Sequence, residues 1–214
     1  MVTQQAYSSE TSTLGAAAIH ALNKFKEMLT SSGPRKVSRA SNRCVHIFTD
    51  ASFEPQADRP FAGIGAVLVD DSGNKLKFIS EELDPILTEE INVSKRKTII
   101  FECKFFSVLC ACVTWKAYMS QCNVMIHTDD DAVRDVFIAC HPASENVLPI
   151  LDTCLECEIS SGCNSWISRV PTESNIADGT SRLQIKDLIN CGCQWDRVDC
   201  LELWSARVRK AGPL

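Results

Sequence analysis

The chain has 214 residues, 45% of them hydrophobic and 23% charged, and a formal net charge of −5. These values are typical of a globular protein with one sizeable core, and the acidic balance argues against a surface that wraps nucleic acid as a whole. No apolar run is long enough to span a membrane, and residues 1–14 lack the features of a secretory signal, so we expect an intracellular protein, cytoplasmic or nuclear, that is not secreted.

Residues 1–42 are expected to precede the folded domain. Residues 1–12 are rich in Ser, Thr and Gln, which predicts disorder, and residues 34–42 have the composition of a linker. Between them, from Leu14 to Leu29, apolar residues recur at helical spacing. This helix either packs against the domain and supports it, or is the C-terminal part of an upstream domain in a longer polyprotein.

A central strand is predicted over Cys44–Phe48, where apolar and β-favouring residues lead directly into Thr49 and Asp50. Gly63–Val69 predicts a second strand, and the polar residues that follow suit a hairpin turn to a third strand over residues 77–80. A carboxylate at the end of a buried strand is costly unless something compensates it, which makes Asp50 a candidate site residue.

A polar segment, Asp84–Val93, precedes the strongest helical pattern in the chain, which covers Ile99–Met119. Glu102 lies in the middle of an apolar face of this helix, at spacings of three, four, seven and eleven from Phe105, Phe106, Leu109 and Val113. A carboxylate in that position is unusual and indicates a functional site. The alternative is that Glu102 caps a frayed first turn.

The opening pattern of an apolar strand followed by Thr-Asp recurs at Val124–Asp129, so Asp129 is a second strand-end acid. Asp130 and Asp131 are expected to cap and begin a short helix over residues 132–139. A helix over residues 147–159, a last strand over residues 165–170 and a final helix over residues 172–183 follow, with Asp178 near the start of that helix. Residues 186–214 are predicted to form a helical extension that packs on the domain surface.

Twelve cysteines are present, most of them inside apolar runs, where Cys behaves as a small hydrophobic residue. Without a secretory signal, reduced thiols are the expected state. Cys154, Cys157, Cys191 and Cys193 could form a zinc site, but the spacing of the second pair and the lack of a nearby His argue against it.

The predicted order is three strands, a helix, a strand, helices, a strand and a helix. Hairpin-connected strands followed by helical crossovers imply an α/β fold with a mixed five-stranded sheet flanked by helices. In such a layout Asp50 and Asp129 lie at neighbouring strand ends, and the helices can bring Glu102 and Asp178 to the same place.

Over residues 43–185 the chain resembles the ribonuclease H domains of retroelement reverse transcriptases. The resemblance depends on five pieces in the family's order: Phe48–Ser52, Gly63–Leu68, Glu102 with Trp115 along its helix, Ile126–Asp129, and Trp166–Pro171 leading to Ser174–Leu183. The most specific piece is Asn-x-Ala-Asp-x-x-Ser-Arg, residues 175–182. The division into residues 1–42, 43–185 and 186–214 follows from this match.

The resemblance implies a metal-dependent endonuclease that hydrolyses the RNA strand of RNA–DNA hybrids, with an upstream reverse transcriptase domain as a further partner. It implies two Mg²⁺ ions, for which Mn²⁺ can substitute, bound by Asp50, Glu102, Asp129 and Asp178. Asp50 would bridge both ions, Asp178 would hold the ion that carries the attacking water, and Glu102 and Asp129 would hold the other. Converging carboxylates need such cations, and hard oxygen ligands select them.

Two departures from the family pattern stand out. The loop after the last strand, residues 170–174, lacks the His that many relatives carry, and Asp130 follows the strand acid where relatives often have Asn or Ser.

Two alternatives to the hybrid-cleaving enzyme remain open. One is a DNA nuclease or integrase-like relative of the same fold, and the other is a catalytically silent nucleic-acid-binding or scaffold module.

Overall fold

The computed structural model describes residues 16–31, 43–55, 60–92, 95–140 and 147–208. The predicted disordered tail of residues 1–12 and the linker of residues 34–42 lie outside the described residues. The chain divides into two compact units, residues 1–35 with 213–214 and residues 36–212. Among the described helices, none combines the length and the apolar character that crossing a membrane requires.

The first unit contains helix α1, Ala16–Ser31, where the sequence predicts a helix from Leu14 to Leu29. Its large apolar side chains are exposed and follow one helical stripe: Ile19, Leu22, Phe25 and Leu29. Spacings of three and four residues place them on one face of the helix.

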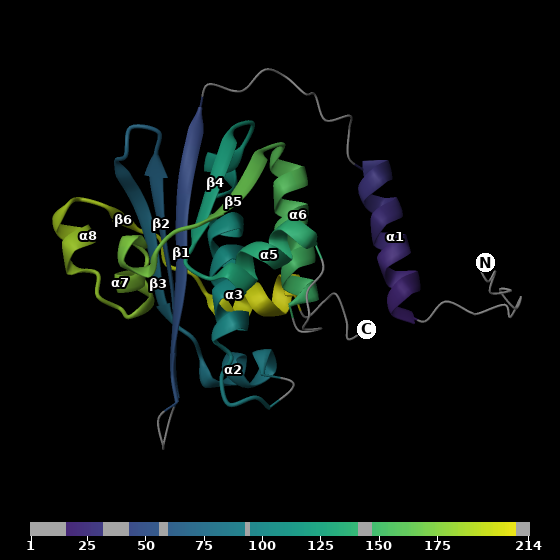
Figure 1. Ribbon diagram of the computed structural model, residues 1–214, viewed down its shortest axis with the longest axis horizontal. Helices are drawn as coiled ribbons and strands as arrows, with labels where there is room; N and C mark the ends of the chain where they lie inside the picture. The colour runs from purple at the N-terminus through teal and green to yellow at the C-terminus, as the bar shows by residue number, and fades with distance from the viewer. Residues whose placement is uncertain (1–15, 32–42, 56–59, 93–94, 141–146, 209–214) are drawn as a thin grey trace, which may run out of the picture. The chain divides into compact units, whose positions relative to one another are not determined.

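The second unit is an α/β structure built on one sheet (Figure 1). Its strands are β1 Cys44–Glu54, β2 Phe61–Asp70, β3 Lys75–Glu82, β4 Asn123–Thr128, β5 Asn164–Arg169 and β6 Gln194–Trp195. Its helices are α2 Pro85–Ile91, α3 Ile100–Thr114, α4 Lys116–Met119, α5 Asp131–Ala139, α6 Leu148–Ser161, α7 Asp178–Ser181, α8 Lys186–Asn190 and α9 Cys200–Leu203. A 3₁₀ turn, Thr172–Ser174, precedes α7, and a π-helical turn, Trp204–Val208, follows α9.

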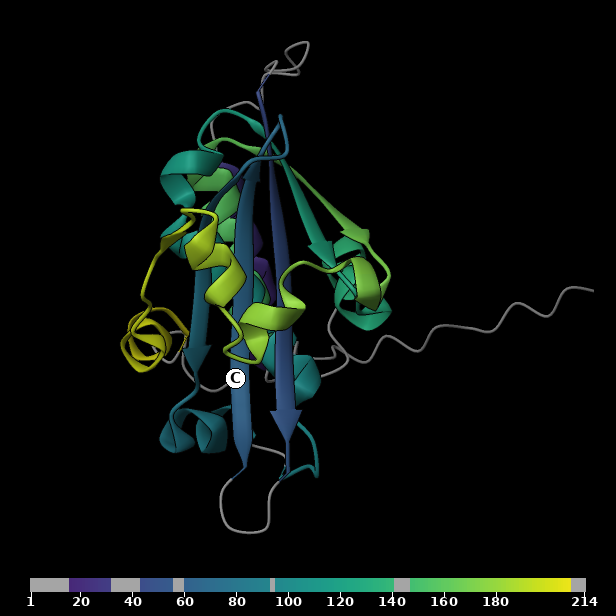
Figure 2. The same ribbon diagram turned by 90° about the vertical axis from the view of Figure 1, so that its left-hand side faces the viewer.

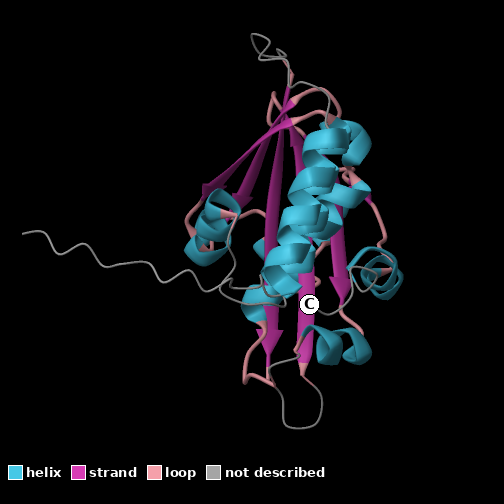
Figure 3. Ribbon diagram, turned by 90° about the vertical axis from the view of Figure 1, so that its right-hand side faces the viewer, coloured by secondary structure: helices cyan, strands magenta, loops and turns pink. Residues whose placement is uncertain are grey.

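The sheet is mixed, with the strand order β5-β4-β1-β2-β3-β6. β1, β2 and β3 form an antiparallel meander, β4 and β5 run parallel to β1, and β6 pairs in parallel with β3. The hairpin turn between β2 and β3 uses Gly73, at φ +84°, as the sequence predicts for a polar turn with Gly and Asn. The strands splay as a twisted sheet does (Figure 3).

Helices cover both faces of the sheet. α3 contacts β1, β2 and α6, and its side chains belong to the main core. On the opposite face α7 contacts β1, β2 and β3, and a smaller apolar cluster forms there around Val67, Phe78 and Leu188 (Figure 2). The central strands are therefore covered by helices on both sides, which explains the nearly continuous apolar run in β2.

The mixed sheet and the order of its first five strands agree with the prediction, and three helical segments differ from it. Asp84–Val93 contains the helix α2, whose start signal is Asp84 as N-cap followed by Pro85. The helix predicted over Ile99–Met119 is interrupted at Trp115, whose φ of −103° and ψ of 19° are not helical. The final helix predicted over residues 172–183 is a 3₁₀ turn followed by the one-turn helix α7.

The segment after residue 185 contributes a sixth strand and core residues, where the sequence predicted only helix. Asp196, just after β6, accepts hydrogen bonds from Lys77 and from the indole of Trp115, each at 2.9 Å. Trp204 is buried and donates its indole N–H to Glu90 at 2.8 Å. A strand of two residues carries no periodicity that sequence reasoning could detect.

Candidate functional site

Asp50 and Asp129 lie close together, where the pairing of β1 with β4 ends. The pairing of β1 with β4 runs from Cys44–Asn123 to Phe48–His127, and Asp50 follows two residues beyond it. β4 ends at Thr128, so Asp129 is the first residue after that strand. Because the two strands are parallel neighbours, both acids lie just beyond the pairing of β1 with β4. The sequence predicted Asp50 at the end of a strand, but β1 continues to Glu54 and Asp50 pairs with Gly65 of β2, so Asp50 lies inside that strand. The side chains of Asp50 and Asp129 are only 4% and 8% exposed.

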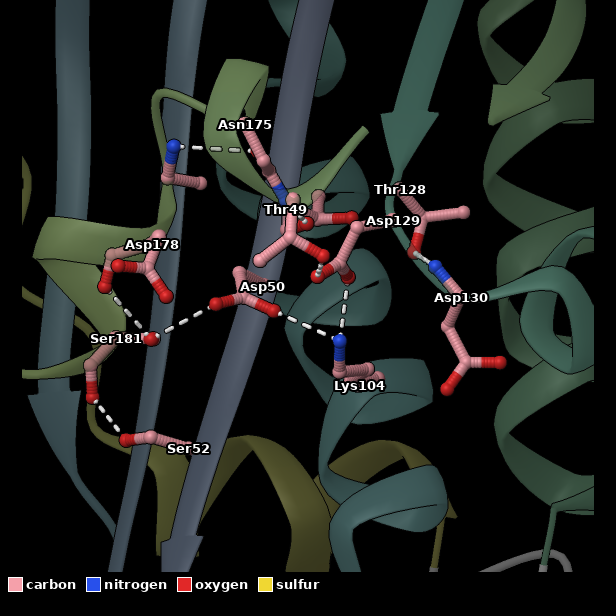
Figure 4. A network of polar contacts seen from close by, with 12 residues as sticks. Thr49, Asp50, Ser52, Lys104, Thr128, Asp129, Asp130, Asn175, Asp178 and Ser181 are labelled. Atoms are coloured by element: carbon pink, nitrogen blue, oxygen red, sulfur yellow. Dashed lines mark hydrogen bonds and ion pairs between the residues drawn. The ribbon is translucent and has the colours of Figure 1, made fainter. Parts of the chain in front are cut away.

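Lys104 of α3 extends its ammonium between these two acids (Figure 4). Nζ lies 3.0 Å from Oδ1 of Asp50 and donates a hydrogen bond to Oδ1 of Asp129. The contact with Asp50 is an ion pair. One buried ammonium therefore serves two buried carboxylates.

The electrostatic balance differs between the two acids. Burial raises the pKa of Asp50 above its usual value, and the charge of Lys104 only partly offsets that effect. Burial also acts on Asp129, but the hydrogen bond and charge of Lys104, together with Thr172, outweigh it and lower the pKa of Asp129. Burial opposes the charged form of Lys104 too, yet Asp129 and Asp50 outweigh it and raise the pKa of Lys104.

The second carboxylate oxygen of Asp50 faces α7. The hydroxyl of Ser181 lies 3.0 Å from Oδ2 of Asp50 and 2.9 Å from the backbone carbonyl oxygen of Asp178, so its single proton serves one acceptor at a time. The carboxylate of Asp178, at the start of α7, forms an ion pair with Arg182 at 3.2 Å. Asp178 is thus close to the Asp50 site through the hydroxyl of Ser181.

Close backbone packing explains the position of α7. A Cβ on Gly65 of β2 would lie 2.2 Å from the hydroxyl oxygen of Thr180, so only glycine permits this approach. Ser52 and Ser80 donate hydrogen bonds to the carbonyl oxygens of residues 181 and 180, at 2.6 and 2.7 Å. Asn175 donates to the carbonyl oxygen of Thr49 at 3.0 Å. The Asn-x-Ala-Asp-x-x-Ser-Arg motif therefore fixes α7 on β1 as well as presenting Asp178.

Glu102 occupies a different position from the other three predicted acids. Its side chain is 3% exposed and pairs with Arg96 at 3.4 Å. The α3 residue that contacts both Asp50 and Asp129 is Lys104, two positions further along the helix. Two positions on an α-helix differ by about 200° around its axis, so the two side chains start in nearly opposite directions.

Asp130 is the N-cap of α5, as the sequence predicts. Its Oδ1 accepts hydrogen bonds from the backbone N–H groups of Ala132 and Val133, at 2.8 and 3.1 Å. Its side chain points away from Lys104 (Figure 4). The neighbouring Asp129 is held instead by Thr172, which donates a hydrogen bond to its Oδ2 at 3.0 Å. Adjacent acids thus have separate roles, one in capping and one in the site.

Comparisons with known proteins identify the fold. No family model and no curated protein match the chain. Solved structures do match: LC11-RNase H1 in complex with an RNA/DNA hybrid has a TM-score of 0.53 at 16% identity, covering 68% of this chain and 99% of that one. RNase H1 from Halobacterium salinarum NRC-1 has a TM-score of 0.51 at 15% identity, covering 67% and 98%. The N-terminal RNase H domain of Rv2228c from Mycobacterium tuberculosis, solved as a fusion with maltose-binding protein, has a TM-score of 0.51 at 13% identity, covering 71% and 100%.

The chain has the ribonuclease H fold. This confirms the predicted fold class, and at these identities the likeness concerns the fold alone.

The side chains present on this ribonuclease H fold do not fit a divalent metal ion. Among the described residues, no three His, Cys, Asp or Glu side chains are grouped so that they could hold one. The third group that meets Asp50 and Asp129 is the ammonium of Lys104, which has three donors and no lone pair to offer a metal. All twelve cysteines are free of disulfide bonds, and Cys154, Cys157 and Cys193 are buried.

Sequence reasoning missed Lys104 because α3 is buried on nearly all sides. An apolar stripe locates the face that meets the core only when the opposite face is polar, and residues 105–112 are buried throughout. A better signal was the placement of small residues. Ser107 and Ala111 follow Lys104 by three and seven positions, and Ser107 donates a hydrogen bond to the carbonyl oxygen of Gly65 at 2.7 Å. Small residues mark the helix face that lies closest to the sheet.

Proposed function

We propose that this chain binds RNA–DNA hybrids at the site formed by Asp50, Asp129 and Lys104, and that it does so without hydrolysing the RNA strand. The observation that carries this proposal is the ammonium of Lys104 between the two carboxylates. Two-metal hydrolysis requires cations that activate water and stabilise the leaving oxygen. A lysine ammonium neutralises the acids but cannot coordinate water or a phosphate oxygen as a metal does.

Two observations support hybrid recognition. LC11-RNase H1, which shares this fold, has been solved with an RNA/DNA hybrid. In this chain, two half-exposed arginines lie on elements next to the acids, and one of them, Arg169, pairs with Asp131 at 3.3 Å. Arg169 lies beside Thr128 in the β4–β5 register, and Arg182 pairs with Asp178. Their side chains are 44% and 45% exposed, so they can contact phosphate oxygens.

The charge balance sets the character of this binding. A chain with a net charge of −5 repels nucleic acid over most of its surface, so attraction must come from local groups. Lys104 reduces the charge of the Asp50–Asp129 pair from −2 to −1 when both acids are ionised, which weakens repulsion of the phosphates at this point. We expect modest affinity that falls steeply as salt is added.

A second candidate is the metal-dependent endonuclease of the sequence prediction. It is favoured by Asp50 and Asp129, which share the cation of Lys104, and by Ser181, which connects Asp50 to the helix that carries Asp178. In that case Mg²⁺ would have to displace Lys104. Membership in a retroelement reverse transcriptase stays a prediction.

Binding is tested with a fluorescently labelled RNA–DNA hybrid in EDTA, by anisotropy, with double-stranded DNA and double-stranded RNA as competitors. We expect saturable hybrid binding that weakens in Arg169→Gln and Arg182→Gln, with the salt slope reduced by about 1 for each phosphate that the variant no longer binds. Lys116→Gln is the matched control. It removes one charge at an exposed position beyond the end of α3. Unchanged binding in both arginine variants would contradict the proposed surface.

Cleavage is tested on the same hybrid and on double-stranded DNA with Mg²⁺, Mn²⁺ or EDTA, followed by denaturing electrophoresis. We expect no difference between the wild type and Asp50→Asn. Metal-dependent cleavage by the wild type that Asp50→Asn abolishes would replace the binding proposal with the endonuclease.

A further inference from the structure

We propose that Lys104 is a built-in replacement for the metal ions of this site, and that the residue at position 104 alone decides whether the Asp50 site binds a divalent cation. This inference rests on the proposed function, which needs an Asp50 site that works without metal. It concerns the free protein, however, and can be tested without nucleic acid.

The first argument is position. Nζ of Lys104 meets one oxygen of each acid, Oδ1 of Asp50 and Oδ1 of Asp129. A cation bridging these carboxylates would be bound by those same oxygens. Mg²⁺ requires oxygen ligands at about 2.0–2.1 Å, so it would lie within a few ångströms of the ammonium. Like charges at that distance repel, and therefore the metal and Lys104 compete for one place.

The second argument is that Lys104 is confined to this position. Its side chain is only 12% exposed. A buried ammonium that left both carboxylates would remain uncompensated unless it reached water, and the vacated acids would repel each other.

The third argument concerns the other two acids that were predicted to bind metal. Glu102 pairs with Arg96, and Asp178 pairs with Arg182. Asp50 and Asp129 are thus the two acids that share a direct partner, and position 104 is the helix position that reaches both. An acid at position 104 would give three carboxylates around one point, which is the kind of ligand set that Mg²⁺ and Mn²⁺ prefer.

The experiment is a Mn²⁺ titration of the protein alone, followed by the electron paramagnetic resonance signal of free Mn²⁺. The variants are wild type, Lys104→Gln and Lys104→Glu, with Lys116→Glu as a control that makes the same charge change at an exposed site. We expect weak wild-type binding that Asp50→Asn leaves unchanged. Lys104→Glu should bind Mn²⁺ at least about tenfold more tightly than the wild type. Substituting residues that only hydrogen-bond to the metal ligands already changes metal affinity about 10–100-fold, and this variant adds a ligand. Adding Asp50→Asn to Lys104→Glu should abolish that gain.

The inference is overturned if the wild type binds Mn²⁺ as tightly as Lys104→Glu, or if Lys116→Glu produces the same gain. If circular dichroism shows that Lys104→Glu does not fold, Lys104→Gln decides. Tighter binding than in the wild type supports the inference, and equal binding overturns it. A failure of the proposed function is separate, because it appears as absent hybrid binding in EDTA, whatever the Mn²⁺ result.

Discussion

Replacing Lys104 by Met should destabilise the fold strongly, although Met fills similar volume. The wild-type ammonium contacts two carboxylates. The side chain of Lys104 is 12% exposed, that of Asp50 is 4% exposed and that of Asp129 is 8% exposed. Removing one partner of a buried ion pair leaves uncompensated charge, which costs about 3–5 kcal/mol. Asp50 can relieve part of this cost by taking up a proton, because burial already raises its pKa.

We therefore expect a loss of about 3 kcal/mol in the free energy of unfolding, at the lower end of that range. For a chain of this size each kcal/mol shifts Tm by about 2–4 °C, so Tm should fall by about 6–12 °C. Urea unfolding followed by tryptophan fluorescence at pH 7 in EDTA measures the difference. Lys116→Met, at an exposed position, is the control and should stay within about 0.5 kcal/mol of wild type.

A triple variant tests the cause of the loss. Lys104→Met combined with Asp50→Asn and Asp129→Asn removes all three charges, and replacing a whole buried ion pair with neutral groups is often close to neutral. It should recover most of the lost stability. The reasoning is refuted if Lys104→Met loses no more than Lys116→Met, or if the triple variant is less stable than Lys104→Met.

Three further predictions concern packing, the C-terminal segment and pH. Gly65→Ala should lower the free energy of unfolding, measured in urea, by about 3 kcal/mol, because the new Cβ would lie 2.2 Å from a side-chain oxygen of α7. Gly179→Ala is the control and should lower it by less than about 1 kcal/mol, because the atom nearest to its Cβ would be 3.3 Å away. Trp115→Phe should cost about 1–3 kcal/mol by the same assay, because it removes the N–H that binds Asp196 at 2.9 Å; an unchanged urea midpoint would contradict a role for this bond. Burial and the neighbouring imidazole of His46 lower the pKa of His127 in the folded protein. As the pH falls, the imidazole of residue 127 is therefore protonated in the unfolded chain before it is protonated in the folded one. The free energy of unfolding consequently decreases as the pH falls below the ordinary His pKa of about 6.5. The difference in urea midpoint between pH 7.5 and 5.5 should therefore be larger in wild type than in His127→Gln, and equal differences would argue against this assignment.

The sequence alone was enough to predict the strand meander, the acid that directly follows β4 and the Asp130 cap. Each of these depends on neighbouring residues: alternation along β1, the Thr-Asp ending of β4, or a side chain that bonds to the helix it precedes. Local patterns of this kind persist whatever the tertiary packing. They placed Asp50 next to Asp129, and both acids contact Lys104, but they ended β1 too early, because the strand continues through Asp50 to Glu54.

The tertiary structure alone decided which residue of α3 meets those acids. The helix is buried on nearly all sides, so its periodicity does not distinguish the direction of Glu102 from that of Lys104. The choice comes from the close approach of Ser107 to Gly65, a contact between segments 42 positions apart. The same holds for β6, whose two residues become a strand only because β3 offers an edge. Rotation of a helix about its axis and pairing of a short edge strand are set by packing between distant segments, and the apolar periodicity of the sequence does not encode them.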